Sequence, residues 1–382
     1  MKRPLDPKHL PLLLLLAACG TSDSVAPAPV QIAVADVNGD GRPDLVVANS
    51  GSGRVSVLVN RLGTDLSIAT DTDVGQHPSC LAVGDLNGDG YPDAAIADNR
   101  RTAPSVLLGL GDGGFSVSEA APVGSGPSGI AVGDVNSDGK PDLVVANAGS
   151  SSVSVLLGRG DGTFPTSAEY PAGAGANSVA IADLDGDGRP DLAVTNGAAN
   201  TLSVLPGHGD GTFGVGIDVA TGAGPRSVVV ADFDRDGRPD VAVATGDPAA
   251  VNVLLNAGGG RFRDAFDYAA AGYRAAVAAA DLDGDGVVDL AVVNFASSQL
   301  SVLLGNGDGT FRPAVQYPES TNLDAGPTSL VVTDLNGDGK PDLAIANYNV
   351  STVSVLFGKG DGSFYEPVDY RSFGPDSGGV NN

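Results

Sequence analysis

The stretch Asp36-Val37-Asn38-Gly39-Asp40-Gly41-Arg42-Pro43-Asp44 decides the fold, because its pattern Asp-x-(Asn/Asp)-x-Asp-Gly-x-x-Asp occurs seven times in the 382 residues. Consecutive copies are 49 residues apart, except the last two, which are 53 apart. A long and even period predicts a repeat architecture in which each unit buries its apolar surface against its neighbours. The copies begin at Asp36, Asp85, Asp134, Asp183, Asp232, Asp281 and Asp334.

Each repeat contains four short apolar or aromatic segments separated by turns, which predicts a four-stranded antiparallel sheet. In the fifth copy these segments are residues 227–231, 241–244, 251–255 and 262–268. Seven such sheets fit an all-β, seven-bladed propeller closed around a central axis, with one Asp-rich loop in every blade. A β-solenoid is less suitable, because its repeats are shorter and lack four turns each.

The unbroken period favours one repeat domain, residues 29–370, over the two or three domains that length alone suggests. Closure would then need no strand exchanged between the two ends of the ring, and the tail 371–382 could cover the seam. The blades are expected to start near Pro29, Pro78, Pro127, Ala176, Pro225, Arg274 and Pro327.

Over residues 29 to about 370 the chain resembles the FG-GAP/VCBS repeat family, which includes the propellers of integrin α-subunits and many bacterial surface proteins. Most repeats also carry Gly-x-Gly-Asp-Gly-x-Phe before the last strand, as in residues 158–164 and 305–311. The first repeat departs from this pattern at residues 60–65, which lack that glycine-rich reversal. Its outer strand is therefore the least well defined by the sequence.

The nine-residue loops, called metal loops below, place side-chain oxygens at positions 1, 3, 5 and 9 and a backbone carbonyl at position 7. Glycine at position 6 allows the sharp turn, as in the first nine positions of an EF-hand loop. Calcium accepts such a flexible oxygen cage, whereas zinc and copper favour Cys or His, which the loops lack. A tight turn without metal is the alternative, and seven copies with every ligand position filled argue against it.

We therefore expect up to seven Ca²⁺ ions, which would contribute directly to folding. The candidate ligands are Asp36, Asn38, Asp40, Arg42, Asp44; Asp85, Asn87, Asp89, Tyr91, Asp93; Asp134, Asn136, Asp138, Lys140, Asp142; Asp183, Asp185, Asp187, Arg189, Asp191; Asp232, Asp234, Asp236, Arg238, Asp240; Asp281, Asp283, Asp285, Val287, Asp289; and Asp334, Asn336, Asp338, Lys340, Asp342, where the seventh residue of each loop offers its carbonyl.

Loops four, five and six carry Asp instead of Asn at position 3, which predicts tighter binding in loops four and six. In loop five, Arg235 and Arg238 are expected to offset the added charge. Affinities near 10⁻⁴–10⁻³ M are typical of extracellular calcium modules. A second set of aspartates, in the glycine-rich reversals, is better explained by the preference of Asp-Gly for hairpin turns than by a second metal. These are Asp112, Asp161, Asp210, Asp308 and Asp361.

The N-terminus predicts export and lipid anchoring. A basic start is followed by the apolar residues 10–18, which are too few to span a bilayer and are typical of a signal peptide. The segment Leu16-Ala17-Ala18-Cys19-Gly20 resembles a bacterial lipoprotein lipobox, which implies a signal peptide 1–18, acylation of Cys19 and a short tether 19–28. Ordinary secretory cleavage is the alternative. The expected location is the cell envelope, and the outer membrane in a host that has one, because Gly rather than Asp follows the cysteine.

The acidic balance excludes nucleic acid as an expected partner. The formal net charge is −25, and it becomes −27 after removal of residues 1–18. Seven divalent ions would reduce it to about −13, with no basic stripe left to neutralise phosphates. Cys80 lies in an apolar run and is expected to be a small buried side chain rather than a reactive group.

Residues that break the repeat are candidates for ligand recognition, because residues shared by all blades serve the scaffold. In a propeller, the metal loops and the glycine-rich reversals lie on one face, so the other two connections of each blade form the opposite face. We call it the binding face. The candidates there are His77, Arg100, Arg101, Tyr273, Arg274, Phe295 and Tyr348, with the four-residue insertion within 319–325. Ordinary loop variation is the alternative for any one of them.

The sequence favours a binding module over an enzyme. Outside the leader the only histidines are His77 and His208, and no nucleophile motif or phosphate loop is present. A protein-binding adhesion or scaffold module is the preferred hypothesis, with the membrane reached only through the lipid anchor. Calcium-dependent recognition of a surface glycan is the alternative, although the absence of Trp leaves few stacking platforms. A polysaccharide-active enzyme is less favoured.

Overall fold

The computed structural model describes residues 28–374 except 62, 64, 247–249, 264, 271–274 and 323. The expected signal peptide, Cys19, nearly all of the tether, and the tail from residue 375 lie outside the described residues, as do Tyr273 and Arg274. Within the described part of the chain, no helix has the length and apolar character that crossing a membrane requires.

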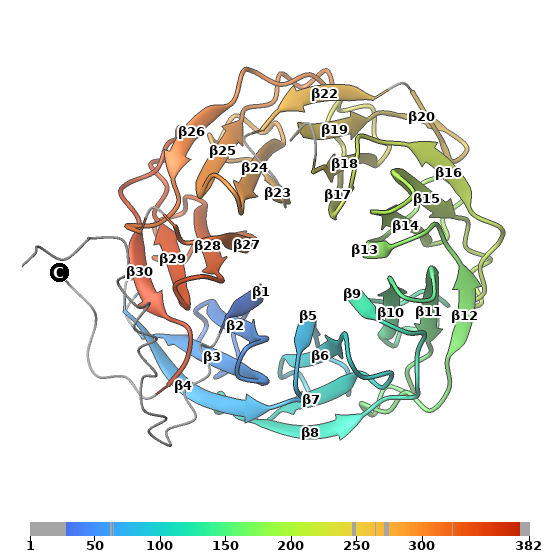
Figure 1. The fold of residues 1–382 in the computed structure, drawn as a ribbon, viewed down its shortest axis with the longest axis horizontal. Helices are drawn as coiled ribbons and strands as arrows, with labels where there is room; N and C mark the ends of the chain where they lie inside the picture. Colours follow the sequence, from blue (N-terminus) through green and yellow to red (C-terminus); the bar gives the residue numbers. More distant parts are fainter. Residues whose placement is uncertain are drawn as a thin grey trace, which may run out of the picture.

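Seven four-stranded antiparallel sheets are arranged as blades around a central axis, which confirms the seven-bladed propeller (Figure 1). Every blade is a simple meander, with its first strand nearest the axis and its fourth on the rim. The first strands are rich in small residues, as in Ala82-Val83-Gly84 of blade 2, because seven first strands converge on the crowded centre.

The first four blades follow the period closely. Their strands are β1 Pro29–Ala35, β2 Asp44–Asn49, β3 Arg54–Asn60 and β4 Leu66–Asp73; β5 Pro78–Gly84, β6 Asp93–Asp98, β7 Ser105–Gly109 and β8 Phe115–Glu119; β9 Pro127–Gly133, β10 Asp142–Asn147, β11 Ser152–Leu156 and β12 Ala168–Pro171; β13 Ala176–Ala182, β14 Asp191–Asn196, β15 Thr201–Leu205 and β16 Ile217–Ala220.

The last three blades have the same order, with one additional small hairpin in blade 5. Their strands are β17 Ser227–Ala231, β18 Asp240–Ala244, β19 Ala250–Leu254, the hairpin strands β20 Asn256–Gly258 and β21 Arg261–Phe262, and β22 Phe266–Ala269; β23 Ala275–Ala280, β24 Asp289–Asn294, β25 Gln299–Leu303 and β26 Val315–Pro318; β27 Pro327–Thr333, β28 Asp342–Asn347, β29 Thr352–Leu356 and β30 Val368–Arg371.

Two details differ from the sequence-based expectation. The outer strand expected over residues 262–268 of blade 5 is divided between β21 and β22, because the glycine-rich reversal continues as a hairpin. The outer strand of blade 1, which the sequence defined least well, is the eight-residue β4 and pairs with β3 along its length.

The core consists of seven layers between neighbouring blades. The second strands are buried along their whole length, and successive residues contact opposite neighbours. In β2, Leu45 and Val47 pack against blade 7, whereas Val46 and Ala48 pack against blade 2. A strand buried on both sides explains the unbroken apolar runs after each metal loop.

The ring closes where blade 7 meets blade 1, without exchange of a strand between the two blades. Thr328 Oγ1 donates to the Pro29 carbonyl at 3.1 Å, and Asn49 Nδ2 donates to the Ser372 carbonyl at 3.2 Å. The Phe373 ring follows β30 in the chain, and its centre lies 5.5 Å from the Arg54 guanidinium of blade 1. The described start of the tail therefore covers the seam.

Candidate metal centres and binding face

The metal loops turn their polar side chains inward, onto their own backbone. In loop 1, the Asp36 carboxylate accepts hydrogen bonds from the backbone of Asp40 and Gly41, at 3.0 and 2.8 Å. Asn38 Oδ1 also accepts from Asp40 N, at 2.9 Å. Gly41, at position 6, has a φ of 82°, a left-handed conformation that side chains with a Cβ rarely adopt. The turn thus gathers the oxygens that were expected to be ligands.

The aspartate at position 9 has a second function that the motif did not reveal. Asp44 is fully buried; its Oδ2 accepts from Val37 N at 3.1 Å, and its Oδ1 accepts from Asn60 N at 2.8 Å. It therefore joins the metal loop to the connection between the third and fourth strands. The equivalent carboxylates of the other blades make the same two bonds; they are Asp93, Asp142, Asp191, Asp240, Asp289 and Asp342.

Burial raises the pKa of Asp44 to about 6, against the opposing effect of its two backbone bonds, and the charges of Asp40 and Asp36 raise it further. The pKa of every other position-9 aspartate is raised in the same way, with burial as the main cause. A cation among these carboxylates would favour their charged forms, as opposite charges do at short range.

Three loops bring carboxylates close enough to hold a metal. In each, one oxygen from each of three aspartates lies within 4.8 Å of the others. Only oxygen atoms converge there, which fits a hard cation such as calcium. These are the loops of blades 4, 5 and 6, which carry Asp at position 3; the sets are Asp183, Asp185 and Asp191; Asp232, Asp234 and Asp240; and Asp281, Asp283 and Asp285.

The side chain at position 7 correlates with which aspartates join the cluster. In blades 4 and 5 this residue is an arginine, Arg189 or Arg238, and it pairs with the position-5 aspartate, which is absent from the cluster. In blade 6 position 7 is Val287, and Asp285 joins the cluster. Arg235, expected to offset charge in its own loop, instead donates to the Gly286 carbonyl of loop 6.

Neighbouring blades are joined at the metal loops by a repeated hydrogen bond, which we call the seam bond. It runs from the connection between the third and fourth strands of one blade to the position-2 carbonyl of the preceding metal loop. In blades 2, 3, 6 and 7 the donor is a backbone N–H of the glycine-rich reversal, and the distances are 3.1–3.2 Å. The four pairs are Gly113 to Val37, Gly162 to Leu86, Gly309 to Phe233 and Gly362 to Leu282.

Blades 1 and 5 lack the Gly-Asp-Gly reversal, and an asparagine side chain replaces it in the seam bond. Asn60 Nδ2 donates to Leu335 O at 2.7 Å, and Asn256 Nδ2 donates to Leu184 O at 2.8 Å. The five other blades have glycine at this position. Sequence reasoning noted the missing reversal of blade 1 but not its replacement, although Asn at the equivalent positions of blades 1 and 5 was the available signal.

The reversal aspartates behave as turn residues. Asp161 Oδ1 accepts from the backbone N–H of Thr163 at 3.0 Å and from its hydroxyl at 2.6 Å. These bonds hold the pKa of Asp161 below its usual value. Asp210, Asp308 and Asp361 make the same pair of bonds, which accounts for the Asp-Gly pattern by the turn alone.

On the binding face, the candidates of blade 2 lie around one buried aspartate. The backbone N–H groups of His77 and Arg100 donate to Asp98 at 3.0 and 2.9 Å. The Arg101 guanidinium pairs with Glu119 and also donates to Val74 O at 3.3 Å. Arg101 is therefore engaged in holding its own blade, whereas Arg100 is exposed.

Phe295 and Tyr348, from the β24–β25 and β28–β29 connections of adjacent blades, form an aromatic pair on this face. Their ring centres are 6.2 Å apart and the rings are tilted by 57°. Tyr348 remains 40% exposed, so the pair is accessible from solvent. Two candidates from different repeats are thus brought together.

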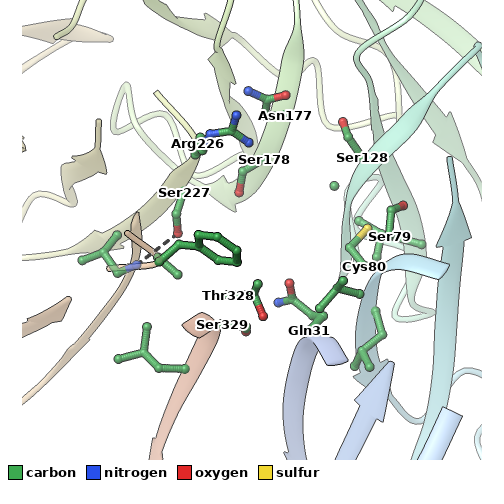
Figure 2. A pocket seen from close by; sticks show the side chains of 18 of the residues that line it. Gln31, Ser79, Cys80, Ser128, Asn177, Ser178, Arg226, Ser227, Thr328 and Ser329 are labelled. Carbon is green, nitrogen blue, oxygen red and sulfur yellow. Dashed lines mark hydrogen bonds between the residues drawn. The ribbon is translucent and has the colours of Figure 1, made fainter. Parts of the chain in front are cut away.

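A cavity of about 320 Å³ lies at the centre of the ring, among the beginnings of the first strands (Figure 2). We call it the axial cavity. Serine and threonine hydroxyls in its wall join one blade to the next: Ser79 to Pro127 O, Ser128 to Ala176 O. Sequence reasoning missed these contacts; the signal was a Ser or Thr directly after the first residue of blades 2, 3 and 7. The other labelled lining residues are Gln31, Cys80, Asn177, Ser178, Arg226, Ser227, Thr328 and Ser329.

The seven loops, with their position-9 carboxylates and one loop per blade, decide the family. The FG-GAP-like repeat family matches residues 36–96, 85–145, 134–194, 183–243, 232–292 and 283–345, and an FG-GAP repeat matches residues 326–365. The chain belongs to the FG-GAP repeat family. Members with this propeller are binding modules, and this FG-GAP propeller carries Asp clusters suited to metal in blades 4–6. A search of curated proteins found no match.

Solved structures share the shape of this FG-GAP propeller. An Agrocybe aegerita lectin, described as recognising non-reducing terminal N-acetylglucosamine, is 20% identical with a TM-score of 0.61, covering 89% of this chain and 94% of the lectin. BBS1N, solved in complex with ARL6DN, is 13% identical with a TM-score of 0.60, covering 87% and 92%. The periplasmic gluconolactonase of Pseudomonas aeruginosa is 19% identical with a TM-score of 0.62, covering 89% and 96%. These proteins have different activities, so the likeness shows the fold alone.

Proposed function

We propose that this FG-GAP propeller is a calcium-stabilised module, anchored to the cell envelope through lipidated Cys19, that binds a protein partner with its binding face. The observation that supports this most directly is the aromatic pair of half-buried Phe295 and exposed Tyr348, which breaks the repeat on the face opposite the metal loops. Aromatic side chains are enriched at the centres of protein interfaces. Adhesion and scaffolding both use such a surface, and neither requires catalysis.

Two further features support the same face. Exposed Arg100 lies on it in blade 2. The insertion between β26 and β27 is held against blade 7, where Ser320 Oγ and Thr321 N donate to Asp369 at 3.0 and 3.1 Å. Residues that differ between the repeats suit recognition when the scaffold holds them in place, because they lose little conformational entropy when a partner binds.

Glycan recognition is the second candidate. It is favoured by the axial cavity, whose wall is rich in hydroxyl and amide groups. A lectin also shares the fold, so sugar binding is compatible with this architecture. The two candidates differ in whether the bound partner is destroyed by protease.

The experiment is a capture of partners from envelope extract, with the propeller immobilised in calcium or in chelator, before and after protease treatment of the extract. We expect calcium-dependent capture that protease abolishes. The double variant Phe295→Ala/Tyr348→Ala should lose it, whereas Tyr365→Ala should not. Tyr365 is a matched control, because it is 58% exposed but lies beside a glycine-rich reversal on the metal-loop face.

Capture that survives protease would replace the protein partner with a glycan. Equal capture by Phe295→Ala/Tyr348→Ala and Tyr365→Ala would remove the aromatic pair from the binding surface. Localisation has its own test: palmitate labelling should be lost in Cys19→Ala, and labelling that persists would contradict the lipid anchor.

A further inference from the structure

The chain enters the propeller on the binding face, at the innermost strand of blade 1 (Figure 1). Ala28 precedes β1, and its carbonyl accepts from the backbone N–H of Ser50 at 3.0 Å and from the Ser50 hydroxyl at 3.1 Å. Its own N–H donates to Ser351 Oγ at 3.4 Å. Ser50 and Ser351 lie in the connections between the second and third strands of blades 1 and 7, which belong to the binding face. Hydrogen bonds to two blades therefore fix the point at which the chain enters the ring.

The lipid anchor proposed above is close to this point in the chain, because Cys19 precedes Ala28 by nine positions. Nine residues span at most about 32 Å when fully extended. A flexible chain of that length has an average end-to-end distance of roughly 15–18 Å. A membrane that holds Cys19 therefore lies within this reach of the middle of the binding face.

The metal-loop face is beyond that reach. Because the first strands converge on the crowded centre, a chain that leaves Ala28 can pass to the opposite face only over the rim. It must cross the three strand spacings of a blade, about 14 Å, and then follow the height of a seven-residue strand such as β3, about 20 Å. The path is therefore about 34 Å long before the metal loops themselves are passed. A membrane that holds Cys19 cannot lie against the metal loops.

From this geometry we propose that the binding face is turned toward the membrane that holds Cys19, and that its partner is a protein of the same membrane rather than of another cell. The inference rests on the proposed function, to which it adds the orientation of the propeller and the kind of partner. The metal loops then point away from the membrane. The bound part of the partner must fit between the binding face and the membrane, within about 32 Å of the lipid surface.

The distribution of charge favours the same orientation. Each of the seven metal loops carries three or four aspartates. A membrane surface that contains anionic lipids repels such an acidic face within about one Debye length. The binding face is nearly neutral, because the charged residues described in its connections are three arginines and two acids. They are Arg100, Arg101, Arg226, Glu319 and Asp324.

The orientation is tested by energy transfer from a dye on the lipidated full chain to acceptor lipids in vesicles, in calcium. Ala199→Cys places the dye in the exposed β14–β15 connection of the binding face, and Arg159→Cys places it in a glycine-rich reversal of the other face. Cys80 is buried and does not compete for the label. We expect transfer from Ala199→Cys to be at least twofold more efficient than from Arg159→Cys.

A longer tether is the matched control for this measurement. About 30 Gly-Ser residues inserted after Ser24 extend the reach well beyond the path over the rim, so the difference between the two dyes should shrink. Equal transfer from the two dyes with the natural tether, or stronger transfer from Arg159→Cys, would overturn the orientation. An unchanged difference with the longer tether would show that the tether does not impose it.

The kind of partner is tested by photo-crosslinking in a mixed culture. Cells that carry a photo-crosslinking amino acid in place of Tyr348 are mixed with isotopically heavy cells that lack this chain. We expect the crosslinked peptides to be light and to come from a membrane protein. The same amino acid in place of Tyr365, which is exposed on the metal-loop face, should give at least tenfold less of that product.

Heavy peptides would place the partner on another cell, and a water-soluble partner would remove it from the membrane; either result overturns the proposal. Equal yields at the two tyrosines would remove the binding face from the contact. The absence of any crosslink would count against the proposed function itself. The vesicle measurement needs no partner, so it would still decide the orientation.

Discussion

A carboxylate at position 9 of each metal loop serves the scaffold before any ion arrives. Asp142, for example, is fully buried and accepts from Val135 N at 2.9 Å and from Gly158 N at 2.8 Å. Asp138, at position 5 of the same loop, is exposed, and its Oδ1 accepts from Lys140 N of its own turn at 2.9 Å. Two aspartates that look equivalent in the motif therefore differ in what their removal would cost.

We expect Asp142→Ala to destabilise the chelator-treated protein by roughly 2–5 kcal/mol, because it leaves two buried N–H groups without acceptors at about 1–3 kcal/mol each. Asp138→Ala should change the free energy of unfolding by less than about 1 kcal/mol under the same conditions. Urea unfolding in chelator measures both. Similar losses in the two variants would contradict a scaffold role for position 9.

Glu319 should make the free energy of unfolding depend on pH. It is 1% exposed, neither carboxylate oxygen has a hydrogen-bond partner among the described residues, and burial, with a smaller effect of Asp369, raises its pKa to about 7. The folded protein therefore binds more protons than the unfolded chain between about pH 4.5 and 7. Stability contributed by this group is present below that range and is lost as the pH rises through it.

Glu319→Gln should accordingly be more stable than the unchanged protein at pH 8, by roughly 1–3 kcal/mol, and the difference should shrink toward pH 5. The matched control is Glu366→Gln, because Glu366 is exposed on the neighbouring blade. The difference between the two unfolding curves across pH isolates Glu319 from the metal loops. A constant difference from pH 5 to pH 8 would disprove the assignment.

At the scale of the element, the metal loops share a backbone and differ in charge. Loop 6 clusters Asp281, Asp283 and Asp285 and has Val287 at position 7, whereas loop 4 has Arg189 paired with Asp187. The sequence led us to expect similar binding in loops 4 and 6. In loop 4 the Arg189 guanidinium competes with calcium for the Asp187 carboxylate, and loop 6 has no such competitor at position 7.

We expect the tightest calcium site to be loop 6. Asp281→Ala should abolish the highest-affinity phase of a calcium titration, whereas Asp85→Ala, in a loop with Asn87 at position 3, should leave that phase intact and reduce the weak binding. Calorimetry in metal-free buffer resolves the two phases. Loss of the tight phase in Asp85→Ala, but not in Asp281→Ala, would reverse the order.

The asparagines that make the seam bond are tested in the same way. Asn256→Ala removes the donor to Leu184 O and to Pro239 O, at 2.8 and 2.9 Å, from a buried position. We expect a loss of roughly 1–3 kcal/mol. Asn306→Ala, which removes an exposed bond to Thr310 within a reversal, should cost less than about 0.5 kcal/mol. Equal losses would show that the seam bond contributes nothing beyond a local turn.

These elements show what could be predicted from the sequence. The period, the strand order and the position of the metal loops follow from a local pattern that occurs seven times. Predicting them therefore required no knowledge of contacts between residues far apart in the chain. The replacement by Asn60 and Asn256 depends on contacts between blades, and the ion pair of Arg189 with Asp187 depends on how neighbouring side chains are placed in the loop. The asparagine that ends the second strand likewise contacts the third strand in blades 1, 3, 4 and 7: the buried Asn147 side chain, for example, donates to Ser154 at 2.9 Å.

On the scale of the whole molecule, each blade is stable only against its neighbours, and the metal loops lie where neighbours meet. Calcium bound to folded loops alone stabilises the ring by mass action, about 1.4–2.7 kcal/mol per site at 10 mM calcium for dissociation constants of 10⁻³–10⁻⁴ M. We expect melting temperatures in 10 mM calcium to exceed those in chelator by on the order of 10 °C. Equal melting temperatures, measured by circular dichroism with magnesium as the control cation, would contradict a stabilising role.

The seam bond has a consequence for how such a gene can change its length. Gly113 and Asn60 reach equivalent carbonyls, those of Val37 and Leu335, so either kind of donor fits behind any blade. Unequal crossing-over between equivalent points of two repeats would delete or duplicate one whole period and leave every donor facing an acceptor. The chain is thus composed of interchangeable cassettes, and the circumference of the ring, rather than the compatibility of its joints, limits how many cassettes a descendant can hold.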